Sequence, residues 1–396
     1  MNSVITATRA CPVCNLTDVV KLHQMNFDLA ETSALPRQYQ VVVCQNCGMT
    51  YADSAASQKN YDIYYEQFSK YEDVKTGSGG GYSNADKSRL ASMAELISGH
   101  LKKSDSIIDV GCANGGLLEA LSVLGHKNLK GVDPSPASIK HVRDRGFGGV
   151  SLKISELTSD KVGVHKAVIL SHVLEHVFDL ATTMRIVLSI LDEDGVLYIE
   201  VPDASRYISH YVVPFHYFDS EHINHFDSTA LRNLAALNGL DVVDEGQKEI
   251  PVSIAVNYPA TYVVLRKHSN CHLRDVQYHD ELSLAIIEYV EKSKDDKRLQ
   301  KIEKYVVSQE PLIIWGAGSY TQSLLVSTHL AECNIIAIVD NDSNKHGLEI
   351  NSIKISNTDI LHDTEGLIVI SAAIYAEEIK NDISAMGLKN KVEILG

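Results

Sequence analysis

The sequence contains no uninterrupted apolar run of the length that spans a bilayer, about 20 residues. Its first residues, MNSVITATRACPVC, lack the basic and then apolar pattern of a secretory signal. We therefore expect a cytoplasmic protein without a membrane partner. Basic residues are also scarce, since 36 Lys and Arg stand against 51 Asp and Glu, a formal charge of −15. This balance argues against nucleic acid as the main ligand.

Cysteine is sparse, with seven residues in a chain of 396, and three of them (Cys112, Cys271 and Cys333) are scattered. This spacing excludes a disulfide framework. The other cysteines form two Cys-x-x-Cys pairs, namely Cys11, Cys14, Cys44 and Cys47. Two such pairs supply four thiolates to one tetrahedral Zn²⁺ and leave no coordination position open. The pattern predicts a structural zinc site in a reducing compartment.

Two alternatives for these cysteines are weaker. A redox-active pair lacks the strand–helix context of such motifs. A zinc ribbon for nucleic acid is disfavoured because Lys and Arg are sparse between the pairs. Residues 51–85 are rich in tyrosine and run into a glycine stretch at 77–81. These rings either pack at a domain seam or form a lid with a glycine hinge. They are Tyr51, Tyr61, Tyr64, Tyr65, Tyr71 and Tyr82.

A glycine-rich turn connects a predicted strand at 107–110 to a predicted helix at 117–124. Glycines let the backbone approach a ligand closely, and the free N–H groups of a helix start point at it. The spacing Asp-x-Gly-x-x-x-Gly, from Asp109, Gly111 and Gly115, differs from the Gly-x-Gly-x-x-Gly of dinucleotide-binding proteins. A second predicted strand, at 129–132, ends in Asp133, where such folds hydrogen-bond a ribose.

Strands and helices continue to alternate through 136–145, 165–191 and 195–203. This order predicts an α/β fold with a doubly wound parallel sheet and its ligand at the carboxyl edge. Residues 211–240 follow, with a helix that Asp227 or Ser228 caps and Gly239 ends. The crowded polar groups before this helix favour a functional site over packing, with a metal site as an alternative. They are His216, Tyr217, Asp219, Glu221, His222, Asn224 and His225.

The last part of the chain predicts strands over 250–266, a long helix over 278–307 and then a second α/β unit. In that unit Gly316-Ala-Gly318 follows a strand at 311–315, and a strand beginning at 334 leads to Asp340. A further strand and helix occupy 366–388. The third glycine of a dinucleotide motif is missing, because Thr321 stands there. We expect this unit to shape a substrate pocket rather than to hold NAD.

Three of these features together resemble class I S-adenosylmethionine-dependent methyltransferases: the IIDVGCANGG motif, Asp133 at a strand end and the HVLEHV turn at 172–177. The order of the modules resembles the nucleotide-sugar C-methyltransferases of deoxysugar and polysaccharide biosynthesis. The resemblance implies a zinc-binding, tyrosine-rich lid module at 1–83 and a methyltransferase domain at 84–248. It also implies a Rossmann-like, substrate-binding domain at 249–396.

By this resemblance, Gly111 and its neighbours hold the amino-acid part of S-adenosylmethionine and Asp133 its ribose. The full cofactor set comprises Asp109, Gly111, Cys112, Asn114, Gly115, Asp133, Pro134, Ser171 and His172.

The family's catalytic segment reads Tyr-His-Glu-His-Phe, and DSEHI at 219–223 falls there. Glu221 and His222 match its Glu-His pair, whereas Asp219 stands at the tyrosine position. The family's Gly-Gly-Ser segment is replaced by PVSIAV at 251–256. The predicted catalytic set is Tyr65, His176, Glu221, His222 and His225.

For carbon methylation we expect His222 to remove a proton next to a ketone, with Glu221 orienting it. His176 and a tyrosine would hold the enolate oxygen. The same base would serve oxygen methylation of a sugar hydroxyl. Other expected classes are an NAD-dependent nucleotide-sugar oxidoreductase and an interaction protein with an inactive core. The predicted partner is a nucleotide-linked sugar, and the chain is expected to be a monomer or a weak homodimer.

Overall fold

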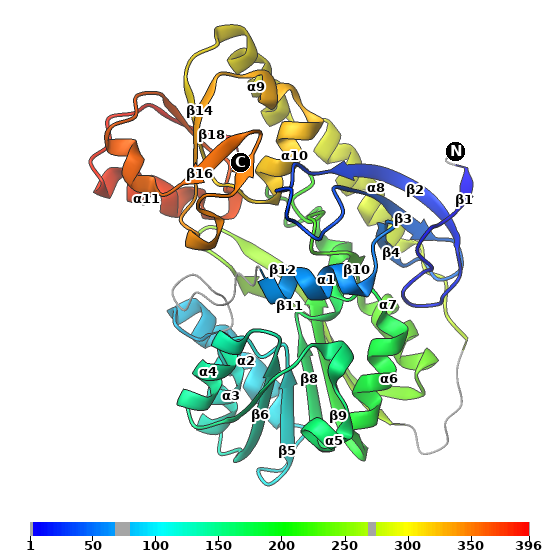
Figure 1. The fold of residues 1–396 in the computed structure, drawn as a ribbon. Helices are drawn as coiled ribbons and strands as arrows, with labels where there is room; N and C mark the ends of the chain where they lie inside the picture. Colours follow the sequence, from blue (N-terminus) through cyan, green and yellow to red (C-terminus); the bar gives the residue numbers. More distant parts are fainter. Residues whose placement is uncertain (1–2, 68–79, 268–274, 396) are drawn as a thin grey trace.

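The computed structural model describes residues 3–67, 80–267 and 275–395, which build three β-sheets. Figure 1 shows the N-terminal sheet and the C-terminal sheet next to each other, with the central sheet below them. The backbone N–H of Asp28 donates to Gln322 O at 3.1 Å, and the Asp28 carboxylate accepts from Asn351 N at 2.6 Å. The first and the last parts of the chain are therefore in direct contact.

The N-terminal sheet has the order β1-β2-β3-β4-β10 and is antiparallel. Its fifth strand comes from far along the chain, since β10 pairs with β4 through Asn224 and Tyr51. This pairing fixes the histidine-rich segment to the cysteine-containing module. The elements are β1 (Val4–Thr6), β2 (Asp18–Asn26), β3 (Gln38–Cys44), β4 (Thr50–Asp53), β10 (Asn224–His225) and helix α1 (Gln58–Gln67).

The central sheet has the order β11-β12-β9-β8-β5-β6-β7. Five strands are parallel, as predicted, and β11 and β12 add an antiparallel hairpin at one edge. Its strands are β5 (Ser106–Val110), β6 (Asn128–Asp133), β7 (Gly148–Ser151), β8 (His165–Ser171), β9 (Leu191–Pro202), β11 (Leu240–Pro251) and β12 (Asn257–Lys267). Its helices are α2 (Asn84–Ser98), α3 (Gly116–Val123), α4 (Pro136–Asp144), α5 (Ser159–Val162), α6 (Leu180–Ile190) and α7 (Ser228–Leu237).

The sheet extends beyond the domain boundary predicted between residues 248 and 249, which falls inside β11. Strand β12 pairs with β9 from Ala260 to Arg266, so the hairpin belongs to the central sheet. Strand β11 mixes buried, half-buried and exposed residues without a clear alternation, and this pattern conceals the pairing in the sequence.

The C-terminal sheet has the order β15-β16-β14-β13-β17-β18, and its strands are parallel except at the β15–β16 pair. Its strands are β13 (Leu312–Trp315), β14 (Ile335–Val339), β15 (Glu349–Ile350), β16 (Ile353–Ser356), β17 (Leu367–Ile370) and β18 (Val392–Ile394). The helices from this part of the chain are α8 (Glu281–Lys294), α9 (Lys297–Ser308), α10 (Ser319–Ser327) and α11 (Ala376–Ala385). The short 3₁₀ helices are η1 (Ile154–Glu156), η2 (Leu174–His176), η3 (Ala204–Arg206), η4 (His329–Glu332), η5 (Ser343–Lys345), η6 (Thr358–His362) and η7 (Ala373–Tyr375).

The single long helix predicted over 278–307 is wrong. Helix α8 ends at Lys294 and α9 begins at Lys297, and the Asp296 side chain between them accepts from the backbone N–H of Arg298 at 2.8 Å. An aspartate that caps a helix start interrupts the helix before it. The charge run hid this cap.

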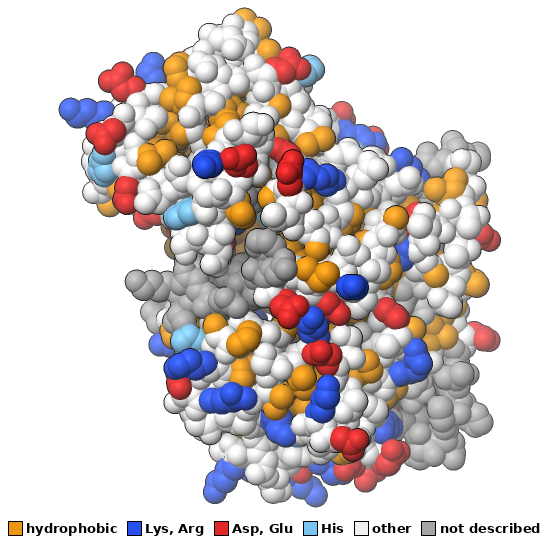
Figure 2. Space-filling model, in the orientation of Figure 1, with side chains coloured by type: hydrophobic (Ala, Val, Ile, Leu, Met, Phe, Trp, Pro, Cys, Tyr) orange, Lys and Arg blue, Asp and Glu red, His pale blue; other side chains and the backbone are white. Residues whose placement is uncertain are grey.

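Acidic and basic side chains are mixed over the face of the molecule in Figure 2. They do not gather there into a patch of one sign. Within the three described ranges, no helix combines the length and the apolar character needed to cross a membrane.

Candidate active site

The glycine-rich turn lies at the carboxyl end of β5, in the middle of the central sheet. Gly111 and Gly115 have φ of +81° and +82°, which residues with a side chain rarely adopt. A Cβ on Gly111 would lie 2.6 Å from Val173 Cγ2, so this position also lacks room for a side chain. Gly115 then caps α3 without a side-chain hydrogen bond. The helix start thus leaves its N–H groups for a ligand.

Two aspartates stand beside this turn. Asp133 ends β6, and its carboxylate accepts from the N–H groups of Ala113 at 3.0 Å and Ser135 at 2.9 Å. Asp109 is 3% exposed, and burial, together with the charge of Asp133, raises its pKa to about 7. A cationic ligand near Asp109 would offset that cost of burial.

A cavity of about 1100 Å³ opens in front of this turn. The structure brings most of the predicted cofactor set to its wall, namely Asp109, Gly111, Cys112, Asp133, Pro134, Ser171 and His172. Asn114 and Gly115 are not among the lining residues, since Asn114 is fully buried and Gly115 occupies the helix cap. The ends of three neighbouring strands, β5, β6 and β8, thus bring these residues together.

The opposite wall of the same cavity comes from the C-terminal sheet. Gly316, Asp340 and Lys345 line it, and Lys345 Nζ lies 3.0 Å from Asp340 Oδ2. The hairpin tip at 250–254 also contributes, and Ile254 N–H donates to the Glu378 carboxylate at 3.0 Å. The segment 251–256 therefore forms a bridge between the two sheets. The predicted role of the second unit in shaping a pocket agrees with this arrangement, whereas Lys345 gave no signal in the sequence.

Four of the five predicted catalytic residues lie close together, and three of them, Tyr65, His176 and His222, line this cavity. The Tyr65 hydroxyl lies 2.7 Å from His176 Nδ1, and the rings of His176 and His222 are 4.7 Å apart. The Tyr64 hydroxyl donates to Glu221 Oε1 at 3.0 Å. Tyr64 is a partner that sequence reasoning missed. Because α1 carries both tyrosines over this cluster, they act as a cover.

The other tyrosines divide between the two predicted roles. Tyr51 and Tyr61 are buried, and Tyr61 stacks on Phe178 at 6.1 Å, so these rings pack at a seam. Tyr82 lines the cavity. Tyr71, Cys271 and most of the predicted glycine hinge lie outside the described residues.

Asp219 takes the place of the expected tyrosine and orients His222. Its Oδ1 accepts from the backbone N–H groups of Glu221 at 2.8 Å and His222 at 2.6 Å. Its Oδ2 lies 3.4 Å from His222 Nδ1. A carboxylate at Nδ1 favours the tautomer whose Nε2 accepts a proton. The substitution thus yields an Asp–His pair of the kind that serves as a general base.

The structure does not place His225 with this group. Its side chain is fully buried between Tyr207 and Phe218, and it does not line the cavity. Burial lowers its pKa to about 3. His225 lies on β10, whose pairing with β4 turns it into the N-terminal sheet. The prediction of a catalytic His225 is therefore corrected to a packing role.

His172 lies between two buried glutamates. Its Nδ1 is 3.1 Å from Glu175 Oε1, and its Nε2 is 3.5 Å from Glu200 Oε1. Burial alone would lower the pKa of His172, but hydrogen bonds to both carboxylates raise it to about 9. Lys248 Nζ lies 2.7 Å from Glu200 Oε2 and supplies the second positive charge. His172 is thus an imidazolium at neutral pH, and its contact with Glu200 of β9 holds it against the central sheet.

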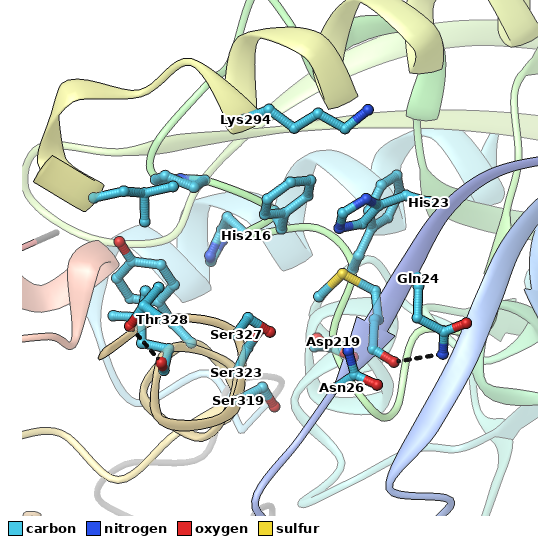
Figure 3. A pocket seen from close by; sticks show the side chains of 17 residues that line it. His23, Gln24, Asn26, His216, Asp219, Lys294, Ser319, Ser323, Ser327 and Thr328 are labelled. Carbon is cyan, nitrogen blue, oxygen red and sulfur yellow. Dashed lines mark hydrogen bonds between the residues drawn. The ribbon is translucent and has the colours of Figure 1, made fainter. Parts of the chain in front are cut away.

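A second, smaller pocket of about 380 Å³ adjoins the main cavity. Both are lined by His216, Asp219, Ser319 and Tyr320. Figure 3 shows His23, Lys294 and the hydroxyl groups of α10 around it. The His23 ring stacks on Phe215 with the centroids 4.2 Å apart. Asp219 therefore stands between two compartments.

The four predicted zinc ligands are close together in the N-terminal module. Cys11 Sγ lies 3.6 Å from Cys47 Sγ, and Cys14 Sγ lies 3.4 Å from Cys44 Sγ. All four sulfur atoms lie within 4.8 Å of one another. Zn–S bonds of about 2.3 Å place sulfur atoms roughly 3.8 Å apart in a tetrahedron. The donor set and its spacing fit Zn²⁺.

Comparison with known proteins agrees with the cofactor turn. Residues 83–245 match a family described as a methyltransferase domain, and residues 308–394 match a family described as C2185-like, N-terminal. The mitochondrial ubiquinone biosynthesis O-methyltransferases of Bos taurus and Homo sapiens are 35% and 33% identical over 102 residues. The match covers 24% of this chain and 27% of each relative, so the chain spans about a quarter of their length.

Solved methyltransferase structures resemble part of the chain. One is a Burkholderia thailandensis 1,6-didemethyltoxoflavin-N1-methyltransferase with bound S-adenosylhomocysteine, 15% identical, with a TM-score of 0.40 and coverage of 57% of this chain and 98% of that one. Another is a Synechocystis magnesium protoporphyrin IX methyltransferase with bound S-adenosylmethionine, 14% identical, with a TM-score of 0.40 and coverage of 54% and 100%.

The family match and the sheet describe the same stretch of chain. The matched residues contain the glycine turn, Asp133 and the five parallel strands. The predicted α/β methyltransferase fold is confirmed for this stretch, with a mixed rather than purely parallel sheet. Residues 83–245 therefore form a class I S-adenosylmethionine-dependent methyltransferase domain.

Proposed function

We propose that this protein transfers a methyl group from S-adenosylmethionine to a nucleotide-linked sugar. One observation carries the proposal: a single cavity is lined by the cofactor turn of the central sheet and by the glycine turn of the C-terminal sheet. Two ligands that enter from the two sheets meet at the His176–His222 cluster. Ligands of open α/β sheets bind at such carboxyl edges.

The central sheet would hold the cofactor. Gly111 and the start of α3 would hold its amino-acid part, and Asp133 would hold its ribose hydroxyls. Asp109 is the buried carboxylate that a cationic cofactor would stabilise. When bound, S-adenosylmethionine supplies an electrophilic methyl group on a positively charged sulfur.

The C-terminal sheet would hold the nucleotide of the acceptor, as a Rossmann-like domain. The start of α10, after Gly318, has no side-chain cap, so its N–H groups suit a phosphate. Lys345 adds a positive charge on the same wall. Asp340 resembles Asp133 and suits a ribose.

His222 would act as the base. Asp219 holds its ring through Nδ1, so Nε2 can take a proton from a carbon next to a ketone or from a hydroxyl. Tyr65 and His176 form a hydrogen-bonded pair beside it that suits the developing oxyanion. The carbon acceptor is our first choice, because this pair provides the enolate with donors.

The N-terminal module would hold a structural zinc and support the active site. Arg9, two residues before the first cysteine, is 5% exposed. Its guanidinium donates to the carbonyl oxygens of Val177 at 3.3 Å and Phe178 at 2.7 Å. It also donates to the carbonyl oxygen of Ile223 at 3.2 Å and to the side-chain oxygen of Asn224 at 2.8 Å. These acceptors directly follow His176 and His222. Metal bound in the module would thus keep both catalytic segments in place.

The test is mass spectrometry of products after incubation of the full chain with S-adenosylmethionine and a panel of nucleotide-linked keto- and hydroxy-sugars. We expect a gain of one methyl group, which NMR would place on carbon or oxygen. His222→Asn should abolish turnover while cofactor binding, measured by calorimetry, stays unchanged. His362→Asn, which alters an exposed histidine of η6 that lines neither pocket, is the matched control. Full turnover by His222→Asn would refute the assigned base.

A further inference from the structure

Glu175 is a buried carboxylate that three histidines surround. It lies in η2 and is 1% exposed. His172 Nδ1 lies 3.1 Å from its Oε1, and His176 Nε2 lies 4.0 Å from the same atom. Ring nitrogens of His176 and His222 and a Glu175 oxygen all lie within 4.8 Å of one another. Oxygen Oε2 has no hydrogen-bond partner among the described residues. A buried carboxylate oxygen without a hydrogen-bond partner is costly, so it needs a reason.

Its neighbours keep Glu175 ionised. Burial by itself would raise the pKa of Glu175, but the hydrogen bond from His172 and the charges of His176, His172 and His222 lower it. Further groups face this cluster: Glu200 and Lys248 from the central sheet, and the phenols of Tyr207 and Tyr258, whose pKa values are raised by burial and by nearby charges that include Glu175. His172 and Lys248 match the charges of the two carboxylates, and the ionised Glu175 lies within 4.8 Å of ring nitrogens of both His176 and His222.

The Glu175 carboxylate could stabilise either a protonated histidine or a bound metal ion. Metal bonds of about 2.1 Å hold neighbouring ligand atoms roughly 3.0–3.4 Å apart. In the cysteine cluster the paired sulfur atoms are already 3.4 and 3.6 Å apart. The Glu175–His176 separation of 4.0 Å is too wide for a shared ion by this measure. The distance favours an electrostatic role.

We propose that Glu175 is a positioning residue of the methyl transfer, the buried counter-charge for the imidazolium that forms when His222 accepts the acceptor's proton. The inference rests on the proposed function. As the carbon–sulfur bond breaks, its electron pair stays on sulfur, and the acceptor forms the new bond to the methyl group. The acceptor's proton passes to His222 Nε2. The Glu175 carboxylate stabilises the positive charge that His222 then carries.

The test is Glu175→Gln in the full chain, which keeps the shape and removes the charge. We expect kcat to fall at least about tenfold and the acidic limb of its pH profile to move lower by roughly one unit, because a weaker base protonates at lower pH. Cofactor affinity should change less than about threefold. Glu200→Gln is the matched buried control, because it removes the other carboxylate at His172. The acidic limb of its pH profile should stay in place. Glu193→Gln is the exposed control, with a side chain 91% exposed.

Imidazole ¹⁵N NMR gives a readout that does not need turnover. In Glu175→Gln, the pH at which the ring signals of His176 and His222 change should move lower, and in Glu193→Gln it should not. An unchanged profile and unchanged ring signals would overturn the proposal. So would elemental analysis showing a divalent metal beyond one zinc per chain that Glu175→Gln loses. Shifted ring signals with no methyl transfer by the wild type would refute the proposed function and leave the charge coupling standing.

Discussion

The two glycine turns of this protein are built alike. Gly111 N–H donates to Val132 O at 2.8 Å, and Gly316 N–H donates to Val339 O at the same distance. The aspartate after each of those valines then accepts from the turn, Asp133 from Ala113 N at 3.0 Å and Asp340 from Ala317 N at 2.7 Å. Each aspartate also accepts from the N–H two residues further on, at 2.9 Å.

The difference between the turns is one of charge. Two residues before the first glycine, β5 carries Asp109, whereas β13 carries Ile314. The second turn instead has Lys345 Nζ 3.0 Å from the Asp340 carboxylate. One backbone design thus suits a cationic cofactor in the central sheet and a phosphate-bearing acceptor in the C-terminal sheet. The predictions below test this division of ligands.

The largest effect is expected from adding a side chain to the first glycine of either turn. Gly111→Ala would place a Cβ 2.6 Å from Val173 Cγ2 at a φ of +81°, so calorimetry should detect no S-adenosylmethionine binding. Gly316→Ala, with Ala372 N at 2.8 Å and a φ of +119°, should bind the cofactor normally and lose the acceptor. Gly146→Ala has a similar φ of +86° in open space and controls for backbone strain. Equal loss of cofactor in both turn variants would contradict the division.

The next effect comes from the paired aspartates. Asp133→Ala should weaken cofactor binding by about 10- to 100-fold, since a hydrogen bond to a charged group contributes roughly 1.5–3 kcal/mol. Asp340→Ala should raise the acceptor KM by a similar factor with unchanged cofactor affinity. Titration of each ligand against both variants measures this. If both variants weakened the binding of the same ligand, the two turns would not bind different ligands.

A smaller effect is expected at Lys345. Replacement by Met keeps the chain length and removes the charge, so the acceptor KM should rise about tenfold when the acceptor carries a diphosphate. The KM for an acceptor without phosphate should stay the same. Lys354→Met, an exposed lysine of the same sheet, is the control. A similar loss for both acceptors would exclude a phosphate contact.

The smallest effect concerns pH and stability. The pKa of Asp109 is about 7 in the fold against 3.8 in the unfolded chain, so the fold keeps a proton that the unfolded chain loses. Its contribution to stability therefore falls as pH rises between about 4 and 7. Between these pH values the Tm of Asp109→Asn should fall less than that of the wild type. The difference should be roughly 2–4 °C for each 1 kcal/mol of unfolding free energy that the wild type loses. Thermal scans at both ends measure this, with Asp340→Asn as control; parallel curves for Asp109→Asn and wild type would contradict it.

Local patterns predicted much of the methyltransferase domain. Asp109, Gly111 and Asp133 mark a strand–turn–helix unit whose ligand edge follows from the chain order of parallel strands. The loop that holds Asp219 and His222 stood out in the sequence because titratable groups are seldom gathered without function, but the pairing of these two residues was not predicted. The break between α8 and α9 was missed because the capping Asp296 stands in a charge run where it gives no distinct signal.

The sequence alone determined the cofactor turn, the two Cys-x-x-Cys pairs and the alternation of strands and helices in the core, since each depends on residues close together in the chain. The tertiary structure decided which histidines meet. His176 and His222 come together because β10 pairs with β4 and Arg9 holds both segments, whereas the same pairing removes His225 from the cavity. It also decided that Gly111 and Gly316 face one cavity, because contacts between distant sheets leave no periodic pattern in the sequence.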